Sequence, residues 1–106
     1  MKINIIITTT DSEKTANDIA KYLVKDNLSP CVQMVFNIQS LYKWKDQLQK
    51  SNEILLLIKT IPKNVKDCKK LILKYHNYDL PEIIVTSGEI LNDEYMEWFI
   101  NNSHYL

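Results

Sequence analysis

The sequence predicts an α+β domain with the ferredoxin-like element order β-α-β-β-α-β, extended by one further helix at its C-terminus. Three observations predict this fold. The chain opens with a β-branched apolar run, two later segments carry apolar residues at helical spacing, and a long stretch of alternating residues lies between them. The length of 106 residues suits one domain, so we expect a single domain over residues 1–106.

The first strand and helix follow from the opening thirty residues. The run from Ile3 to Thr8 is β-branched and apolar, which is typical of a buried strand. Thr10 and Glu13 form a T-x-x-E pattern, which predicts a helix start with a capping box. Asn27 is expected to end that helix, because asparagine tolerates the left-handed conformation. The apolar stripe of this helix consists of Ala16, Ile19, Ala20, Leu23 and Val24.

A long hairpin is predicted in the middle of the chain. From Val32 to Trp44 the residues alternate, and the following positions are expected to share one face: Val32, Met34, Phe36, Ile38, Tyr42 and Trp44. Lys45–Gln47 suits a short turn, and the second arm runs from Leu48 to Thr60. A strand of this length is expected to extend beyond the body of the domain.

The second half of the chain supplies the remaining elements. Pro62 suits the first turn of a helix. The apolar stripe of this second helix is expected to consist of Val65, Cys68, Leu71, Ile72 and Tyr75. Pro81 is expected at the start of a fourth strand over residues 83–86, which Gly88 ends. Asn92 can cap a last helix, on which we expect Trp98 to pack within its own subunit.

One face of the predicted sheet has no helix left to cover it. Val35, Leu55 and Leu57 are available to that face. The far end of the hairpin carries Tyr42 and Trp44, which are large side chains for an exposed position. We therefore expect other copies of the chain to bury this surface.

The charge balance excludes several function classes. Thirteen basic residues face thirteen acidic ones, and every basic residue is lysine. A neutral chain without arginine is a poor candidate for nucleic-acid binding, and it lacks the arginine expected of a ferredoxin-like acylphosphatase. We find no nucleophile, oxyanion hole or cofactor loop, so we predict that the protein is not an enzyme.

Cysteine content and hydropathy indicate the compartment. Cys31 and Cys68 fit no C-x-x-C spacing, and two cysteines make no disulfide framework. The apolar run at the N-terminus is too short for a signal sequence or a membrane span. We therefore expect a cytoplasmic protein that does not associate with membranes.

Five local strings, in order along nearly the whole chain, resemble the CutA family of divalent-cation-tolerance proteins. They are Leu28–Gln33, Ser40–Trp44, Glu53–Thr60, His76–Ile83 and Asn92–Trp98. The resemblance implies a compact homotrimer, similar in architecture to PII-type signalling proteins. It also implies a role in tolerance of, or response to, divalent metal ions such as copper. The alternative is a PII-like trimeric sensor or scaffold that binds a small ligand or partner protein between subunits, with no metal role.

Two residues within these strings are candidate metal ligands. His76 offers a neutral imidazole, and Cys31 offers a thiolate, so Cu(II) or another divalent cation is the metal that they suggest. The structural alternatives are a histidine that caps helix carbonyls and a buried free cysteine. Some bacterial members of the CutA family have a cysteine near the end of the first strand and a pair of adjacent histidines. At the corresponding positions this chain has Ile7 and the pair Tyr75-His76.

Five further residues are candidates for a ligand-binding cleft between subunits. They are polar-tipped or charged side chains within apolar strings, namely Tyr42, Trp44, Lys59, Tyr78 and Glu82. An ammonium and a carboxylate in such a cleft could orient a small ligand. Equally, these side chains could pair with one another across the interface and fix its register.

Overall fold

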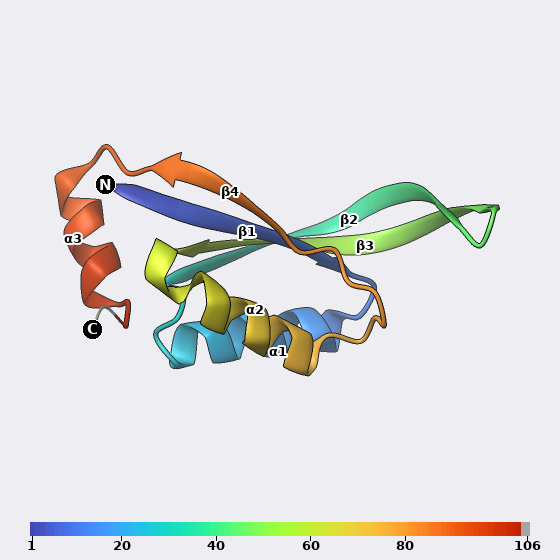
Figure 1. Cartoon of the computed structure of the whole chain (residues 1–106), viewed down its shortest axis with the longest axis horizontal. Helices are drawn as coiled ribbons and strands as arrows, with labels where there is room; N and C mark the ends of the chain where they lie inside the picture. The colour runs from blue at the N-terminus through green and yellow to red at the C-terminus, as the bar shows by residue number, and fades with distance from the viewer. Residues whose placement is uncertain (105–106) are drawn as a thin grey trace.

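The computed structural model describes residues 1–104, so the last two residues of the predicted domain lie outside the described residues. The element order is the predicted one (Figure 1). The elements are β1 (Lys2–Thr10), α1 (Glu13–Lys25), β2 (Cys31–Trp44), β3 (Gln47–Thr60), a short 3₁₀ helix η1 (Pro62–Asn64), α2 (Val65–Tyr75), β4 (Ile84–Glu89) and α3 (Asp93–Asn101).

The four strands form one antiparallel sheet in the order β2-β3-β1-β4. Helices α1 and α2 lie side by side on one face of this sheet, and α3 lies apart from them at the end where β4 finishes (Figure 1). The main core fills the space between the sheet and the two helices. Its fully buried side chains include Ile6, Ile19, Leu23, Leu56, Ile58 and Ile72.

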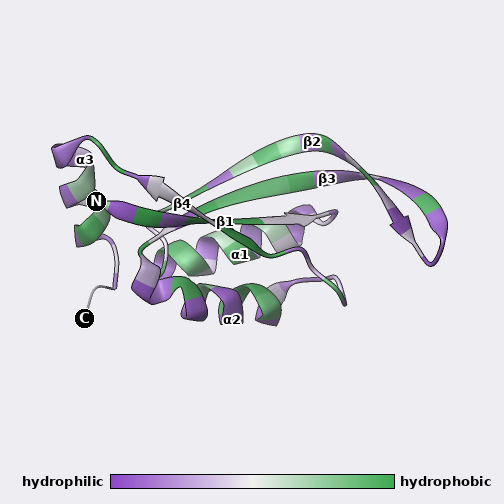
Figure 2. Cartoon of the chain, turned by 45° about the horizontal axis from the view of Figure 1, so that its top comes forward, coloured by the Kyte–Doolittle hydropathy of each residue, from purple (hydrophilic) through white to green (hydrophobic). Residues whose placement is uncertain are grey.

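The opposite face of the sheet is apolar, and α1 and α2 leave it open because both lie on the other side of the sheet (Figure 1). Ile7 pairs with both Leu57 and Ile84, so these three side chains point to the same side. Leu55 lies two residues before Leu57 and therefore shares that side, opposite the buried Ile54, Leu56 and Ile58. Figure 2 shows the apolar colouring that β1, β2 and β3 carry through the middle of the sheet. We refer to this surface as the uncovered face.

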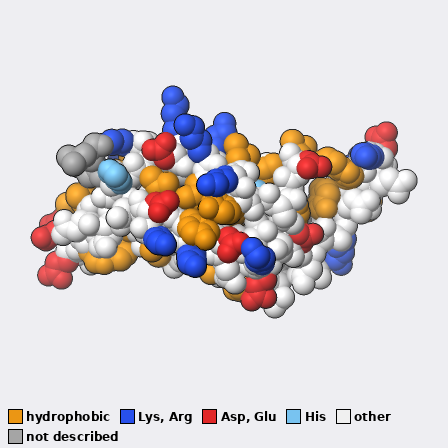
Figure 3. Space-filling model, turned by 90° about the horizontal axis from the view of Figure 1, so that it is seen from below, with side chains coloured by type: hydrophobic (Ala, Val, Ile, Leu, Met, Phe, Trp, Pro, Cys, Tyr) orange, Lys and Arg blue, Asp and Glu red, His pale blue; other side chains and the backbone are white. Residues whose placement is uncertain are grey.

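The helix side of the molecule has a mixed surface. Figure 3 shows lysine side chains spread among acidic and apolar ones over α1 and α2. The one ion pair within residues 1–104 joins Lys14 and Asp18 on α1. No helix in this part of the chain combines the length and the apolar character needed to cross a membrane.

The start of α1 differs from the prediction. The N-cap is Ser12, whose Oγ accepts a hydrogen bond of 3.1 Å from the backbone N–H of Thr15. Thr10 cannot cap the helix, because it is still part of β1 and pairs with Ile54. The end of α1 is as predicted, since Asn27 follows it with a left-handed φ of 58°.

A β-bulge interrupts the long strand β2. The register shifts between Val35, which pairs with Leu55, and Ile38, which pairs with Glu53, and Asn37 has a left-handed φ of 62°. The extra residue reverses the alternation, so Val35 and Ile38 share one face while Val32 and Met34 lie on the other. The predicted single apolar face along β2 is therefore wrong. Tyr42 and Trp44 follow Ile38 onto the side of the uncovered face.

The hairpin closes with a two-residue turn and extends well beyond the helices (Figure 1). Lys45 and Asp46 both have positive φ, at 51° and 62°, which is the geometry of a type I′ turn. Each arm has 14 residues. The predicted overlong hairpin is confirmed, with its second arm beginning at Gln47.

The strand β4 is longer than predicted. Gly88 lies within it and pairs with Ile3, so glycine does not end the strand. A Cβ at this position would lie 3.3 Å from Cδ1 of Ile5, which indicates that Gly88 provides room for a close neighbour. Pro81 was expected at the start of the strand, but it lies in the preceding loop, three residues before Ile84.

Helix α3 is capped as predicted. Oδ1 of Asn92 accepts hydrogen bonds from the backbone N–H groups of Glu94 and Tyr95. The buried residue of the helix is Phe99, which packs with Ile3 and Ile61. Trp98 was expected to pack within its own subunit. Its ring lies beside that of Tyr95, with centroids 5.4 Å apart, but its side chain is 44% exposed.

Candidate functional site

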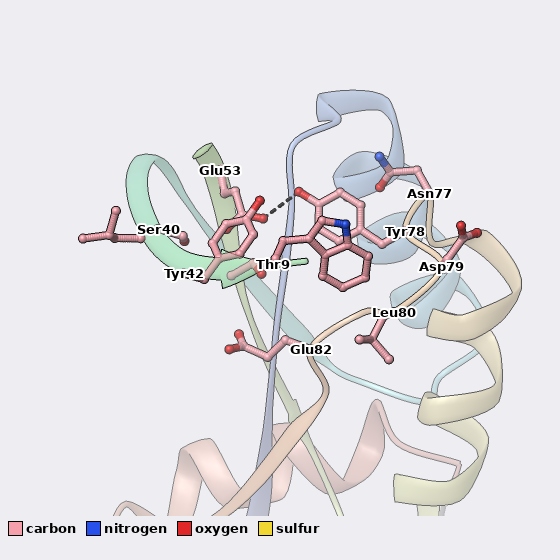
Figure 4. A pocket seen from close by; sticks show the side chains of 11 residues that line it. Thr9, Ser40, Tyr42, Glu53, Asn77, Tyr78, Asp79, Leu80 and Glu82 are labelled. Carbon is pink, nitrogen blue, oxygen red and sulfur yellow. Dashed lines mark hydrogen bonds between the residues drawn. The ribbon is translucent and has the colours of Figure 1, made fainter. Parts of the chain in front are cut away.

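A cavity of about 750 Å³ opens where the hairpin leaves the body of the domain (Figure 4). It lies between β2, β3, the end of β1 and the loop of residues 76–83. This volume is within the usual range for small-molecule sites. The lining residues are Thr9, Ser40, Leu41, Tyr42, Trp44, Glu53, Asn77, Tyr78, Asp79, Leu80 and Glu82.

A short hydrogen bond joins two residues of the cavity wall. The hydroxyl of Tyr78 donates to Oε2 of Glu53 at 2.6 Å, the dashed line in Figure 4. Glu53 is only 6% exposed, although its side chain is acidic. Burial raises the pKa of Tyr78 well above its ordinary value, and the hydrogen bond and negative charge of Glu53 raise it further. The phenol therefore stays protonated and remains a donor to the carboxylate.

His76 holds the loop that carries Tyr78. Its Nδ1 accepts a 3.0 Å hydrogen bond from the backbone N–H of Tyr78. Since Nδ1 is an acceptor, the proton of the neutral ring lies on Nε2, which donates to the carbonyl of Thr9 at 2.9 Å. Burial lowers the pKa of His76, in keeping with this neutral form. Both ring nitrogens are thus used to join the loop to the end of β1.

Asn77 adds a second connection between the same loop and β1. The hydroxyl of Thr10 donates to Oδ1 of Asn77 at 2.6 Å. The amide Nδ2 of Asn77 donates to Asp11 at 2.8 Å. The loop therefore has side-chain hydrogen bonds from both His76 and Asn77, which fix the wall of the cavity.

Four of the five predicted cleft residues line this cavity, namely Tyr42, Trp44, Tyr78 and Glu82. Lys59 does not. It lies six residues beyond Glu53 on an extended strand, a separation of about 20 Å. Lys59 pairs with Cys31 and Ile5 at the other end of the uncovered face.

The cavity is acidic and aromatic. Its lining contains the carboxylates of Glu53, Asp79 and Glu82, and it contains no lysine or histidine from the described part of the chain. The rings of Tyr42, Trp44 and Tyr78 supply much of the remaining wall. Sequence reasoning missed Glu53 and Asp79. The signal for Glu53 was an acidic residue directly before the continuous apolar run that begins at Ile54.

The structure does not bring together the two predicted metal ligands. Cys31 pairs with Lys59, which pairs with Ile5 in the middle of β1. His76 bonds to Thr9, four residues further along β1 and about 13 Å away along the strand. Within residues 1–104 no three His, Cys, Asp or Glu side chains are grouped closely enough to hold a metal ion.

Cys68 belongs to the core, as predicted. It is fully buried, and burial raises the pKa of its thiol to about 11. Its Sγ lies 3.6 Å from the carbonyl oxygen of Leu28 and from Oγ1 of Thr60. The protonated thiol therefore acts as a small apolar side chain and a weak donor.

Comparison with known proteins identifies the family. The family model described as CutA1 divalent ion tolerance protein matches residues 4–102. The divalent-cation tolerance protein CutA of Thermus thermophilus is 33% identical over 99 residues, covering 93% of this chain and 96% of its own length. The chloroplastic Protein CutA of Arabidopsis thaliana is 30% identical over 102 residues, covering 93% of this chain and 54% of its own length.

A solved structure agrees with these sequence relatives. The divalent cation tolerance protein from Thermus thermophilus has a TM-score of 0.88 at 33% identity, covering 97% of this chain and 99% of that one. The present chain thus spans nearly all of the Thermus protein and about half the length of the Arabidopsis one. The chain therefore belongs to the CutA1 divalent ion tolerance family, and this membership supports a role in divalent metal ion tolerance.

Proposed function

We propose that this chain forms a homotrimer that acts in divalent metal ion tolerance as a binding protein, without catalytic activity. The observation that carries the proposal is the uncovered face of the sheet. Family membership supports the link to divalent ions. We also propose a cytoplasmic location, although relatives differ in this respect, as the chloroplastic Arabidopsis protein shows.

The uncovered face has the character of a subunit interface. Val35 is 42% exposed and Ile84 is 50% exposed, at opposite edges of the sheet. On the same side of the projecting hairpin, Tyr42 is 42% exposed and Trp44 is 46% exposed. A contiguous apolar surface of this kind is typical of an interaction site. Closed symmetric association would bury the same surface on every subunit.

The cavity favours a second candidate function, that of a trimeric sensor or scaffold in the manner of PII proteins. Its walls are fixed by the hydrogen bond between Tyr78 and Glu53 and by the two ring contacts of His76. A fixed cavity that is partly aromatic and partly charged suits a small ligand. In this second candidate function, the trimer would sense the small ligand that the cavity binds.

Light scattering after size exclusion tests the assembly. We expect a particle of about three times the 12.5 kDa chain mass. Leu55→Lys places a charge on the uncovered face and should dissociate the particle into smaller species. Lys70→Glu, on the exposed side of α2, is the matched control and should leave the mass unchanged. A wild-type protein that is folded and monomeric at micromolar concentration would refute the homotrimer.

A further inference from the structure

We propose that the cavity at the base of the hairpin binds an organic ammonium group between the carboxylate of Glu53 and the rings of Tyr42, Trp44 and Tyr78. This inference deepens the ligand-binding role proposed above and rests on it, because it assigns a chemical class to the occupant of the same cavity. Three properties of the cavity support it: the charge of its wall, the nature of its apolar surface and its size.

The charge of the wall is the first argument. Glu53 is almost fully buried, and its contact is with the uncharged hydroxyl of Tyr78. A buried carboxylate is costly unless a positive group accompanies it. Among residues 1–104 the only ion pair is Lys14–Asp18, so no lysine of the described chain neutralises Glu53. Asp79 and Glu82 add negative charge to the same cavity.

The aromatic surface is the second argument. A cation placed over the face of tryptophan or tyrosine is attracted by the ring, and quaternary ammonium groups are bound in this way. Tyr42, Trp44 and Tyr78 line one cavity together with the carboxylates. An anion would be repelled by this wall. A ligand with a positive head and an apolar body matches both of its components.

The size of the cavity is the third argument. At about 750 Å³ it is far larger than a bare metal ion needs. Within residues 1–104 no three His, Cys, Asp or Glu side chains are close enough to coordinate such an ion. The space therefore suits an alkylammonium ion better than a dehydrated divalent cation.

The ammonium group has two sources in a trimer. One is a free amine from solution, and the other is a lysine of a neighbouring copy. Lys59 is the relevant lysine. It lies two residues beyond Leu57 on β3, so its side chain is on the uncovered face. Both sources present an ammonium group, and choline titration of the wild type and of Lys59→Met distinguishes them.

Calorimetric titration of the assembled protein with choline tests the proposal. The matched ligand control is 3,3-dimethylbutan-1-ol, which has the shape of choline without its charge. We expect choline to bind at least about tenfold more tightly than the alcohol. Glu53→Gln keeps an acceptor for Tyr78 and should weaken choline binding at least about tenfold. Glu89→Gln, on the far end of β4, should leave it unchanged.

The remaining outcomes are equally decisive. If the wild type binds no choline but Lys59→Met does, the ammonium site is real and the neighbouring lysine is its occupant. If neither protein binds choline, or if choline and the alcohol bind equally, the ammonium proposal is wrong. Light scattering of the same samples keeps the two proposals apart. A trimer without choline binding retains the proposed assembly, whereas a monomer that binds choline retains only the ammonium site.

Discussion

Tyr78 and Glu53 are 25 positions apart in the sequence, and their side chains meet in a hydrogen bond of 2.6 Å. This contact joins the loop after α2 to the strand β3 at the point where the hairpin leaves the domain. The carboxylate is buried, so the phenol is the group that satisfies it. The pair is therefore both a structural connection and part of the cavity wall.

Removal of this hydroxyl should destabilise the protein. Tyr78→Phe leaves the buried carboxylate without its donor, and we expect the free energy of unfolding to fall by about 1–3 kcal/mol. Tyr42→Phe is the matched control, because its hydroxyl contacts Ser51 at an exposed position and should cost less than about 1 kcal/mol. Denaturant unfolding measures both values. Equal losses in the two variants would show that the Tyr78–Glu53 contact has no special weight.

Acidification should weaken the fold through His76. Burial lowers the pKa of His76 in the folded state, so the unfolded chain takes up a proton first as the pH falls. The contribution of His76 to stability is thus complete above the unfolded pKa of about 6.5 and declines below it. Protonation of Nδ1 would also break its bond to the backbone of Tyr78.

The measurement is the free energy of unfolding at several pH values on both sides of that pKa. His76→Gln should be less stable than the wild type at neutral pH and should lose less stability on acidification. His104→Gln is the control and should follow the wild type. If the His76→Gln and wild-type curves run parallel, His76 does not titrate in the way that its two hydrogen bonds require.

Copper binding at His76 stays a prediction, and the geometry indicates that it is weak. Cu(II) must take either Nδ1 from the amide of Tyr78 or Nε2 from the carbonyl of Thr9. We expect weak Cu(II) binding that falls on acidification, since metal and proton compete for the imidazole. Calorimetry should show that His76→Ala loses this binding and Cys31→Ser keeps it. Tight binding that survives in His76→Ala would place the ligands elsewhere, with Cys31 the first to examine.

The two tryptophans allow a comparison of the hairpin with α3 in assembly. Trp44 is 46% exposed and Trp98 is 44% exposed in the single chain, so the two are matched in exposure. Aromatic side chains often dominate interfaces, and Trp44 lies on the projecting hairpin. We expect Trp44→Ala to make the melting temperature depend on protein concentration in the micromolar range, because dissociation then precedes unfolding.

Trp98→Ala should lower the melting temperature with little dependence on concentration. A series of melting curves over a range of concentrations compares the two variants directly. The reverse pattern would mean that α3, and not the hairpin, holds the subunits together.

Sequence patterns predicted the element order because each element carries its own local signal. The caps at Asn27 and Asn92 are examples, since each depends on one side chain and its immediate neighbours. The bulge beside Asn37 has no such signal, because it depends on the register with β3. Gly88 misled the prediction because glycine ends some strands and allows a close approach in others.

The same distinction applies to the cavity. Tyr42, Trp44, Tyr78 and Glu82 were found through family strings, which carry information about the folded molecule. Lys59 and Glu53 lie within one such string, yet the extended strand β3 places them about 20 Å apart. Tertiary geometry decides which residue of a family string lines the cavity. The periodicity of the sequence alone does not show this.

The central position of β1 has a consequence for the order in which the fold is completed. During synthesis on the ribosome β1 emerges first, but Asn4 pairs with Thr60 and Lys2 pairs with Glu89. The strands β2 and β3 are joined by a tight turn, so this hairpin can form early. The first of these four strands to be made is therefore the last to gain both neighbours, and the sheet closes only when β4 is available.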